Sequence, residues 1–274
     1  MNTIIKKLIK TLLILPIFTT ILFANANQVF KKIEHDLDSI IIKDLNKKQL
    51  IFQKESNKKI RPASLTKIMT AIMAIESGKM NSPVTITPAM IKVEPTILGL
   101  KAGEKVLLKD LVNAALIKSA NDATNAIAIY LGNGDKKRFV HGMNVKAKKL
   151  GMKNTNFQNP CGFDDTNHKS TASDLLKLTE YAIKNKTFNA IVKKESYTFK
   201  TLNTKRTYTA RTSNKLLATE KYMIGVKTGY TSKAGACLIA RAKEGKQDIL
   251  LVMLNSHNRW ENTKLALDTV LKKK

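Results

Sequence analysis

A chain of 274 residues with 43% hydrophobic residues can bury a sizeable core, which excludes an intrinsically disordered protein. The length suits one large domain or two small ones. Cys161 and Cys237 lie far apart and outside any metal-ligand spacing, so the fold cannot depend on a disulfide framework, and the sequence leaves their pairing open. The formal charge of +27 indicates either an anionic partner or lysine-rich solvated faces.

The amino-terminal segment has a composition of its own. Lysines at its start precede an apolar run over residues 12–23, and Ala24-Asn25-Ala26 follows. This pattern predicts a signal peptide over residues 1–26; the alternative is an uncleaved anchor, for which the run is short. Both interpretations place residues 27–274 outside the cytoplasm, in the periplasm or peripheral to the inner membrane. The expected electrostatic partner is then an anionic membrane or wall polymer. No nucleic acid is expected as a partner.

The predicted elements place strands at both ends of the chain and helices between them. Residues 39–44 and 50–54 predict a β-hairpin, and an apolar stripe with helical spacing follows Ser64. Further helices are predicted over residues 109–117, 123–130, 136–150 and 171–184, the last with a capping pattern at its start. Strands are predicted over 223–226, 237–242 and 249–254, and a final helix over 260–271.

This order of elements predicts an α+β fold. An antiparallel sheet built from both chain ends would pack against a helical insertion. Neither a low-complexity linker nor a second domain start is visible, so residues 27–274 are predicted to form a single domain.

The first motif with chemical meaning is an S-x-x-K sequence from Ser64 to Lys67. A lysine-rich chain produces such matches by chance, and residues 56–59 are another. Only Ser64 opens a predicted buried helix, where side chains three residues apart share a face. A serine becomes a nucleophile when a neighbouring base takes its proton, and a lysine can be that base when burial or a nearby cation disfavours its ammonium form.

Two further motifs are Ser-Ala-Asn at residues 119–121 and Lys-Thr-Gly at residues 227–229. The former lies between two predicted helices, where it can point into a cleft or simply cap a helix. The latter ends a predicted strand, so its lysine and threonine would face opposite sides, while its glycine allows close approach of a substrate backbone. An ammonium and a hydroxyl at this position can bind a carboxylate.

In this order the three motifs resemble the signature of the penicillin-recognising serine enzymes. The closer similarity is to the low-molecular-mass penicillin-binding proteins, the D-alanyl-D-alanine carboxypeptidases, over residues 62–71, 119–123 and 225–235. The resemblance implies a β-lactamase/transpeptidase-like fold. It also implies removal of the terminal D-alanine from peptidoglycan stem pentapeptides, with β-lactam antibiotics as covalent inhibitors and without a cofactor or metal.

The resemblance further implies a role for each motif residue. The implied catalytic residues are Ser64, Lys67, Ser119 and Asn121. The implied substrate-binding residues are Lys227, Thr228, Gly229 and Tyr230. Ser64 would be acylated with Lys67 as its general base, the second motif would relay protons and hold the substrate amide, and the third would bind the terminal carboxylate. Backbone N–H groups of Ser64 and Tyr230 would form the oxyanion hole.

The sequence departs from the family pattern at three points. Many relatives carry a further β-rich domain and a C-terminal amphipathic anchor, and we expect no C-terminal β domain here. Arginines that some relatives use near the substrate carboxylate are not clearly matched, so Arg211 and Arg259 stay unassigned. Cys161 stands where relatives often have histidine, and we expect a packed or half-exposed thiol without a catalytic part.

Several other functions remain open. A DD-endopeptidase would use the same site to cut crosslinks between stem peptides. A class A β-lactamase would need a glutamate for rapid deacylation, and residues 157–168 contain only aspartates. A silent wall-binding or β-lactam-sensing module would not need the Ser64 and Lys67 pair. A histidine triad is disfavoured because the four histidines are scattered and are expected at the surface or as caps; they are His35, His141, His168 and His257.

Overall fold

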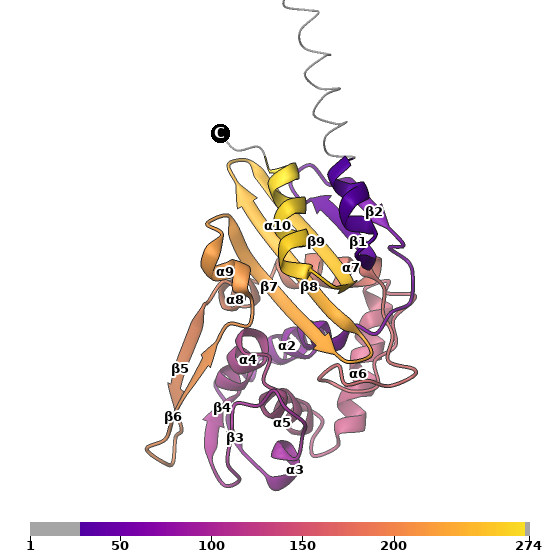
Figure 1. The fold of residues 1–274 in the computed structure, drawn as a ribbon. Coiled ribbons are helices and arrows are strands. Elements are labelled where there is room, and N and C mark those ends of the chain that lie inside the picture. Colours follow the sequence, from indigo (N-terminus) through magenta and orange to yellow (C-terminus); the bar gives the residue numbers. More distant parts are fainter. Residues whose placement is uncertain (1–27, 272–274) are drawn as a thin grey trace, which may run out of the picture.

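The computed structural model describes residues 28–271, so the predicted signal peptide lies outside the described residues. Its centre is a five-stranded antiparallel sheet with the strand order β2-β1-β9-β8-β7 (Figure 1). The strands are β1 (Leu37–Asp44), β2 (Gln49–Lys54), β7 (Met223–Thr231), β8 (Gly235–Glu244) and β9 (Gln247–Ser256). Strands from both chain ends pair at the middle of the sheet, which confirms the predicted α+β architecture.

A hydrophobic cluster covers each face of the sheet, and the side chains of a strand contribute alternately to the two clusters. Ile40 and Ile42 of β1 belong to the same hydrophobic cluster as Leu267 of α10 (Arg259–Val270). Ile41, between them, belongs to the cluster that contains the large helical part of the chain. Figure 1 shows α10 across one face of the sheet and α7 behind the other.

The helical part forms one layer around α2, whose residues are almost all buried. Its helices are α2 (Lys67–Glu76), α3 (Pro88–Ile91), α4 (Leu108–Ile117), α5 (Asn121–Leu131), α6 (Lys136–Lys149), α7 (Ala172–Ala182) and α8 (Lys186–Ile191). The other short elements are the 3-10 turn η1 (Ala63–Thr66), α9 (Lys215–Thr219), and the two-stranded sheets of β3 (Pro83–Thr85) with β4 (Lys105–Leu107) and β5 (Ser196–Lys200) with β6 (Thr207–Arg211). A helix apolar on all sides belongs in a core, which explains the central position of α2.

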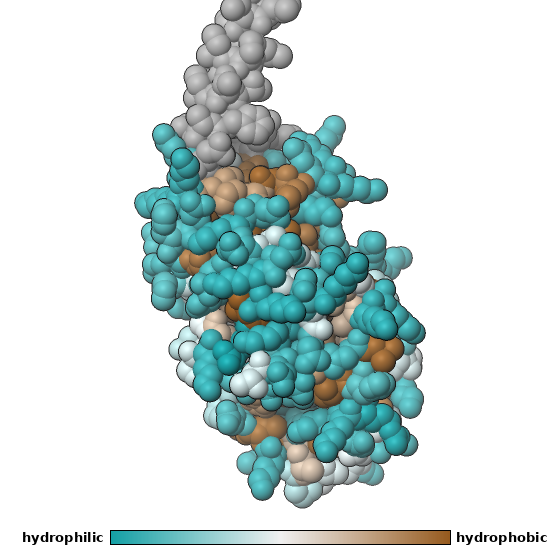
Figure 2. Space-filling view, turned by 90° about the vertical axis from the view of Figure 1, so that its right-hand side faces the viewer, coloured by the Kyte–Doolittle hydropathy of each residue, from teal (hydrophilic) through white to brown (hydrophobic). Residues whose placement is uncertain are grey.

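The surface is mostly hydrophilic on the face shown in Figure 2, where hydrophobic residues form small separate patches. Within residues 28–271, no helix combines the length and the apolar character that a membrane span requires.

Candidate active site

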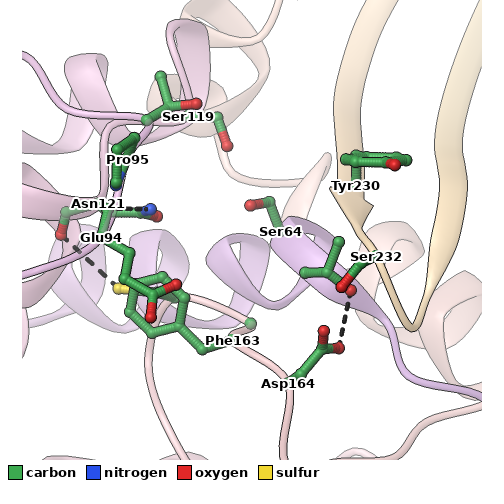
Figure 3. A pocket seen from close by; sticks show the side chains of 13 residues that line it. Ser64, Glu94, Pro95, Ser119, Asn121, Phe163, Asp164, Tyr230 and Ser232 are labelled. Carbon is green, nitrogen blue, oxygen red and sulfur yellow. Dashed lines mark hydrogen bonds between the residues drawn. The ribbon is translucent and has the colours of Figure 1, made fainter.

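The three motifs meet around one pocket of about 470 Å³. The pocket lies between the start of α2, the link from α4 to α5, and strand β7 (Figure 3). The motif residues that line it are Ser64, Ser119, Asn121 and Tyr230. Residues 67, 227 and 228 are buried and do not line this pocket. The structure thus brings together stretches that are widely separated in the sequence.

Ser64 and Lys67 are held in direct contact at the start of the buried helix. The Lys67 Nζ atom donates hydrogen bonds to Ser64 Oγ at 2.7 Å and to the backbone carbonyl of Cys161 at 2.7 Å. Ser64 lies in η1, and α2 begins only at Lys67, so the predicted helix starts with a 3-10 turn. Side chains at i and i+3 eclipse each other in a 3-10 turn, which favours this contact.

The environment of Lys67 makes its charged form less favourable than that of an exposed lysine. The side chain is fully buried, and this burial lowers the pKa of Lys67 to about 8. A free amine can accept the Ser64 proton through its lone pair while one of its own N–H groups stays bonded to the Cys161 carbonyl. Contact and pKa together therefore suit a serine–lysine nucleophile pair.

Two glycines let the backbone close tightly around the nucleophile. A Cβ on Gly162, where φ is +88°, would lie 1.8 Å from the carbonyl oxygen of Ala63. A Cβ on Gly229 would lie 3.2 Å from the Ser64 backbone nitrogen. The loop at Gly162 and the strand β7 thus pack closely against the turn that carries Ser64. A side chain at Gly162 would displace this turn.

The Lys-Thr-Gly motif lies within β7, which continues to Thr231. The sequence placed the motif at a strand end, but β7 and β8 stay paired up to their hairpin, with Thr231 opposite Gly235. Lys227 is buried, and its Nζ donates to the Thr228 carbonyl at 3.0 Å. Burial lowers the pKa of Lys227 well below its usual value, and the nearby charges of Lys67 and Arg259 lower it further.

The hydroxyl of Thr228 and the guanidinium of Arg259 complete this side of the site. Thr228 Oγ1 shares a 2.6 Å hydrogen bond with Ser213 Oγ. Arg259, which the sequence left unassigned, donates from Nη1 to the Gly229 carbonyl at 2.6 Å. It therefore anchors β7 at the motif. Arg211 is an exposed residue at the end of β6.

Ser119 and Asn121 are placed by a tight link between α4 and α5. Ser119 has a positive φ of 66°, and Asn121 is the first residue of α5. The Asn121 Nδ2 atom donates to the Glu94 carbonyl at 2.9 Å, and its backbone N–H donates to the Thr96 carbonyl at 2.7 Å. The second motif thus points into the pocket and also holds the segment that forms one wall.

Asp122 is a structural residue that the sequence analysis did not find. Its buried carboxylate accepts hydrogen bonds from the backbone N–H groups of Leu98, Gly99 and Leu100 at 2.8–3.1 Å. Such multiple N–H contacts fix a loop against a helix start. The signal in the sequence was an acidic residue directly before the helix predicted over residues 123–130.

The cysteines are free and buried. Burial raises the pKa of the Cys161 thiol to about 11 and that of Cys237 to about 11, so both are protonated at neutral pH. The part of Cys161 that bears on the site is its carbonyl, which binds Lys67. This agrees with the expected packed thiol.

His168, expected at the surface or as a cap, is instead a buried link in the site's scaffold. The Gln158 backbone N–H donates to His168 Nδ1 at 3.1 Å, which places the ring hydrogen on Nε2. Nε2 then donates to Thr66 Oγ1 at 2.9 Å, and Thr66 Oγ1 donates to the Ala63 carbonyl at 2.8 Å. Ala63 directly precedes Ser64 in the chain. The neutral imidazole therefore links the loop that leads to His168 with the turn that carries Ser64.

We predict that His168 makes folding stability fall in mild acid. Burial lowers the pKa of His168 to about 4, although Asp165 and Asp164 partly oppose this. The folded state therefore favours the neutral ring, and its contribution is complete above the unfolded pKa of about 6.5 and is lost as pH falls toward 4. The free energy of unfolding should drop by about 3 kcal/mol through this group.

Urea unfolding between pH 4 and 7.5 checks this prediction. The matched variants are His168→Gln, which should flatten the pH dependence, and His35→Gln at an exposed position, which should keep the wild-type slope. An unchanged slope in His168→Gln would contradict the prediction.

Within residues 28–271, the structure contains no group of three or more His, Cys, Asp or Glu side chains placed to hold a metal ion.

Comparison with known proteins agrees with this arrangement. Residues 25–258 match the peptidase S11 family model, described as D-alanyl-D-alanine carboxypeptidase. The D-alanyl-D-alanine carboxypeptidase DacF of Bacillus subtilis is 32% identical over 92% of this chain and 66% of its own length. The D-alanyl-D-alanine endopeptidase of Escherichia coli is 31% identical over 81% of this chain and 72% of its own length.

The structural similarity is equally broad. The crystal structure of the Streptomyces K15 DD-transpeptidase superimposes with a TM-score of 0.81 and 28% identity, covering 85% of this chain and 96% of that one. The chain spans about two thirds of the Bacillus subtilis relative and 59% of the Escherichia coli carboxypeptidase DacC. The family match covers most of the chain, and the chain therefore belongs to the D-alanyl-D-alanine carboxypeptidase family, peptidase S11.

Proposed function

We propose that this protein is a serine-type D-alanyl-D-alanine carboxypeptidase that acts through an acyl-enzyme on Ser64. The observation that carries the proposal is the 2.7 Å contact between Ser64 Oγ and the buried Nζ of Lys67, whose pKa is lowered to about 8. A serine that lines a pocket beside an amine of lowered pKa is suited to nucleophilic catalysis.

Acylation would begin with proton transfer from Ser64 Oγ to the free amine of Lys67. The oxygen attacks the carbonyl between the two D-alanines, and the backbone N–H groups of Ser64 and Tyr230 stabilise the oxyanion. The C–N bond then breaks, and the leaving amine takes a proton delivered from Lys67 through Ser119. Water hydrolyses the ester in a second step, which restores the Ser64 hydroxyl.

Substrate binding would use groups on both sides of Ser64. The terminal carboxylate is held beside Lys227 and Thr228, whose hydroxyl is oriented by Ser213. Gly229 allows β7 to lie close to the nucleophile turn. The side-chain amide of Asn121 holds the donor peptide on the opposite side. Because β-lactams offer a reactive carbonyl and a carboxylate in the same relation, they should acylate the same serine.

The proposed partners follow from this chemistry. The substrate is the peptidoglycan stem pentapeptide, which places the protein outside the cytoplasm, with residues 1–26 as its signal peptide and 27–274 as its catalytic domain. The positive charge would hold it near anionic membrane or wall polymer. Nucleic acid and cofactors have no part in the mechanism.

A second candidate is a DD-endopeptidase, because one relative carries that name. Incubation with a stem pentapeptide and, separately, with a crosslinked peptide dimer separates the two. Release of D-alanine from the pentapeptide with an intact dimer supports the carboxypeptidase. Cleavage of the dimer alone would support the endopeptidase, and cleavage of neither substrate would contradict both.

A further inference from the structure

Within the proposed function, we infer that Glu94 selects donor peptides with a positively charged side chain on the residue before the D-alanine pair. The substrate class is a stem peptide whose diamino acid has a free amine. This inference rests on the proposed function and concerns only the choice among its substrates.

The charge of the pocket lining is opposite to that of the chain. The sequence contains 48 lysines and arginines against 21 aspartates and glutamates. The charged residues that line the pocket are nevertheless both acidic, Glu94 and Asp164. The basic residues of the site, Lys67 and Lys227, are buried rather than part of this lining. A negatively charged lining attracts a cationic group of a ligand.

Glu94 is the acidic residue that remains available for such a group. Asp164 accepts a hydrogen bond from Thr231 Oγ1 at 2.7 Å and lies 4.0 Å from the Arg61 guanidinium. Among residues 28–271, the Glu94 carboxylate has neither a hydrogen-bond partner nor an ion pair, and the residue is exposed. Its carboxylate therefore lines the pocket without an ion pair to any of these residues.

The backbone of Glu94 is held in place by the catalytic machinery itself. Its carbonyl accepts the hydrogen bond from Asn121 Nδ2, and the Thr96 carbonyl accepts the one from the Asn121 backbone. Further along the same segment, the Asp122 carboxylate accepts hydrogen bonds from the backbone N–H groups of residues 98–100. Glu94 is consequently positioned relative to the group that would hold the donor amide.

The direction of the donor peptide brings its side chains toward Glu94. In the proposed binding mode the leaving D-alanine would point to Thr228. The donor would then run the other way, past Asn121. Figure 3 shows the Glu94 carboxylate on this side, next to Phe163 and across the pocket from Tyr230.

The free amine of the diamino acid is the cation that an uncrosslinked stem peptide offers in this region. Acylation of that amine, as in a crosslink, removes its charge. A carboxylate without an ion pair at Glu94 therefore favours donor peptides whose own diamino acid has not been acylated as the acceptor of a crosslink.

Two peptides that differ only in one acetyl group test the inference. Both end in Lys-D-Ala-D-Ala with an acetylated amino terminus, and the lysine ε-amine is free in one and acetylated in the other. An exposed ion pair should give the free amine an advantage of about threefold to fivefold in kcat/KM at low salt. This ratio should shrink with added salt, should fall to about one in Glu94→Gln, and should invert in Glu94→Lys.

A matched control is Glu55→Gln, an exposed glutamate directly after β2, at the edge of the sheet opposite β7. It should keep the wild-type ratio. Equal kcat/KM for the two peptides in the wild type, or a wild-type ratio in Glu94→Gln, would overturn the inference and leave the proposed function standing. Cleavage of neither peptide by the wild type would overturn the proposed function with it.

Discussion

Lys67→Met slows acylation by benzylpenicillin about 10²–10⁴-fold, the range expected when a general base is removed. Lys67 contacts the Ser64 hydroxyl and is the nearest candidate base, and methionine fills a similar volume without an amine. The fold should survive, because burying a thioether costs less free energy than burying an amine. Stopped-flow acylation and thermal unfolding of the same samples check both statements.

The pH dependence of the wild type tests the same group independently. Because the pKa of Lys67 is about 8 and the base must be uncharged, the acylation rate should rise tenfold per pH unit below 8 and level off above it. Lys79→Met, at an exposed position just after α2, is the control and should keep the wild-type rate and profile. Wild-type acylation in Lys67→Met would show that another group takes the serine proton.

Gly162→Ala removes acylation almost completely and lowers the free energy of unfolding by about 2–4 kcal/mol. The new Cβ would lie 1.8 Å from the Ala63 carbonyl, and alanine is also strained at a φ of +88°. The nucleophile turn would have to move away from the loop that provides the Cys161 carbonyl. Benzylpenicillin labelling and urea unfolding measure the two effects.

Gly151→Ala separates the clash from the backbone strain. Gly151 has a φ of +71°, but a Cβ there meets nothing within 4 Å. The Gly151→Ala substitution should lower the free energy of unfolding by about 1–2 kcal/mol, because of the left-handed conformation alone, and should leave acylation unchanged. Equal loss of labelling in both variants would contradict the proposed contact between Gly162 and the nucleophile turn.

The elements that the sequence predicted correctly carry strong local signals. The hairpin over 39–44 and 50–54 corresponds to β1 and β2, since short runs of β-branched or apolar residues are typical of strands. The predicted cap of the helix over 171–184 is present, with the Asp174 N–H donating to Thr171 Oγ1 at 3.1 Å. The hairpin and the helix cap both depend on residues that lie only a few positions apart in the sequence.

Features that depend on distant contacts could not be read in this way. His168 and Thr66 are 102 positions apart, and no periodicity relates a histidine to a turn at that distance. The same holds for Asp122, which binds a loop 22–24 residues before it. The 3-10 turn at Ser64 also escaped prediction, because an apolar stripe reports the buried face and not the first hydrogen bonds of a helix.

Mass spectrometry of the protein after exposure to benzylpenicillin tests the central claim most directly. We predict one covalent adduct, located on the peptide that contains Ser64, that persists for minutes and is absent from Ser64→Ala. A labelled Ser64→Ala variant, or an adduct located on another residue of the wild type, would contradict the assignment of the nucleophile.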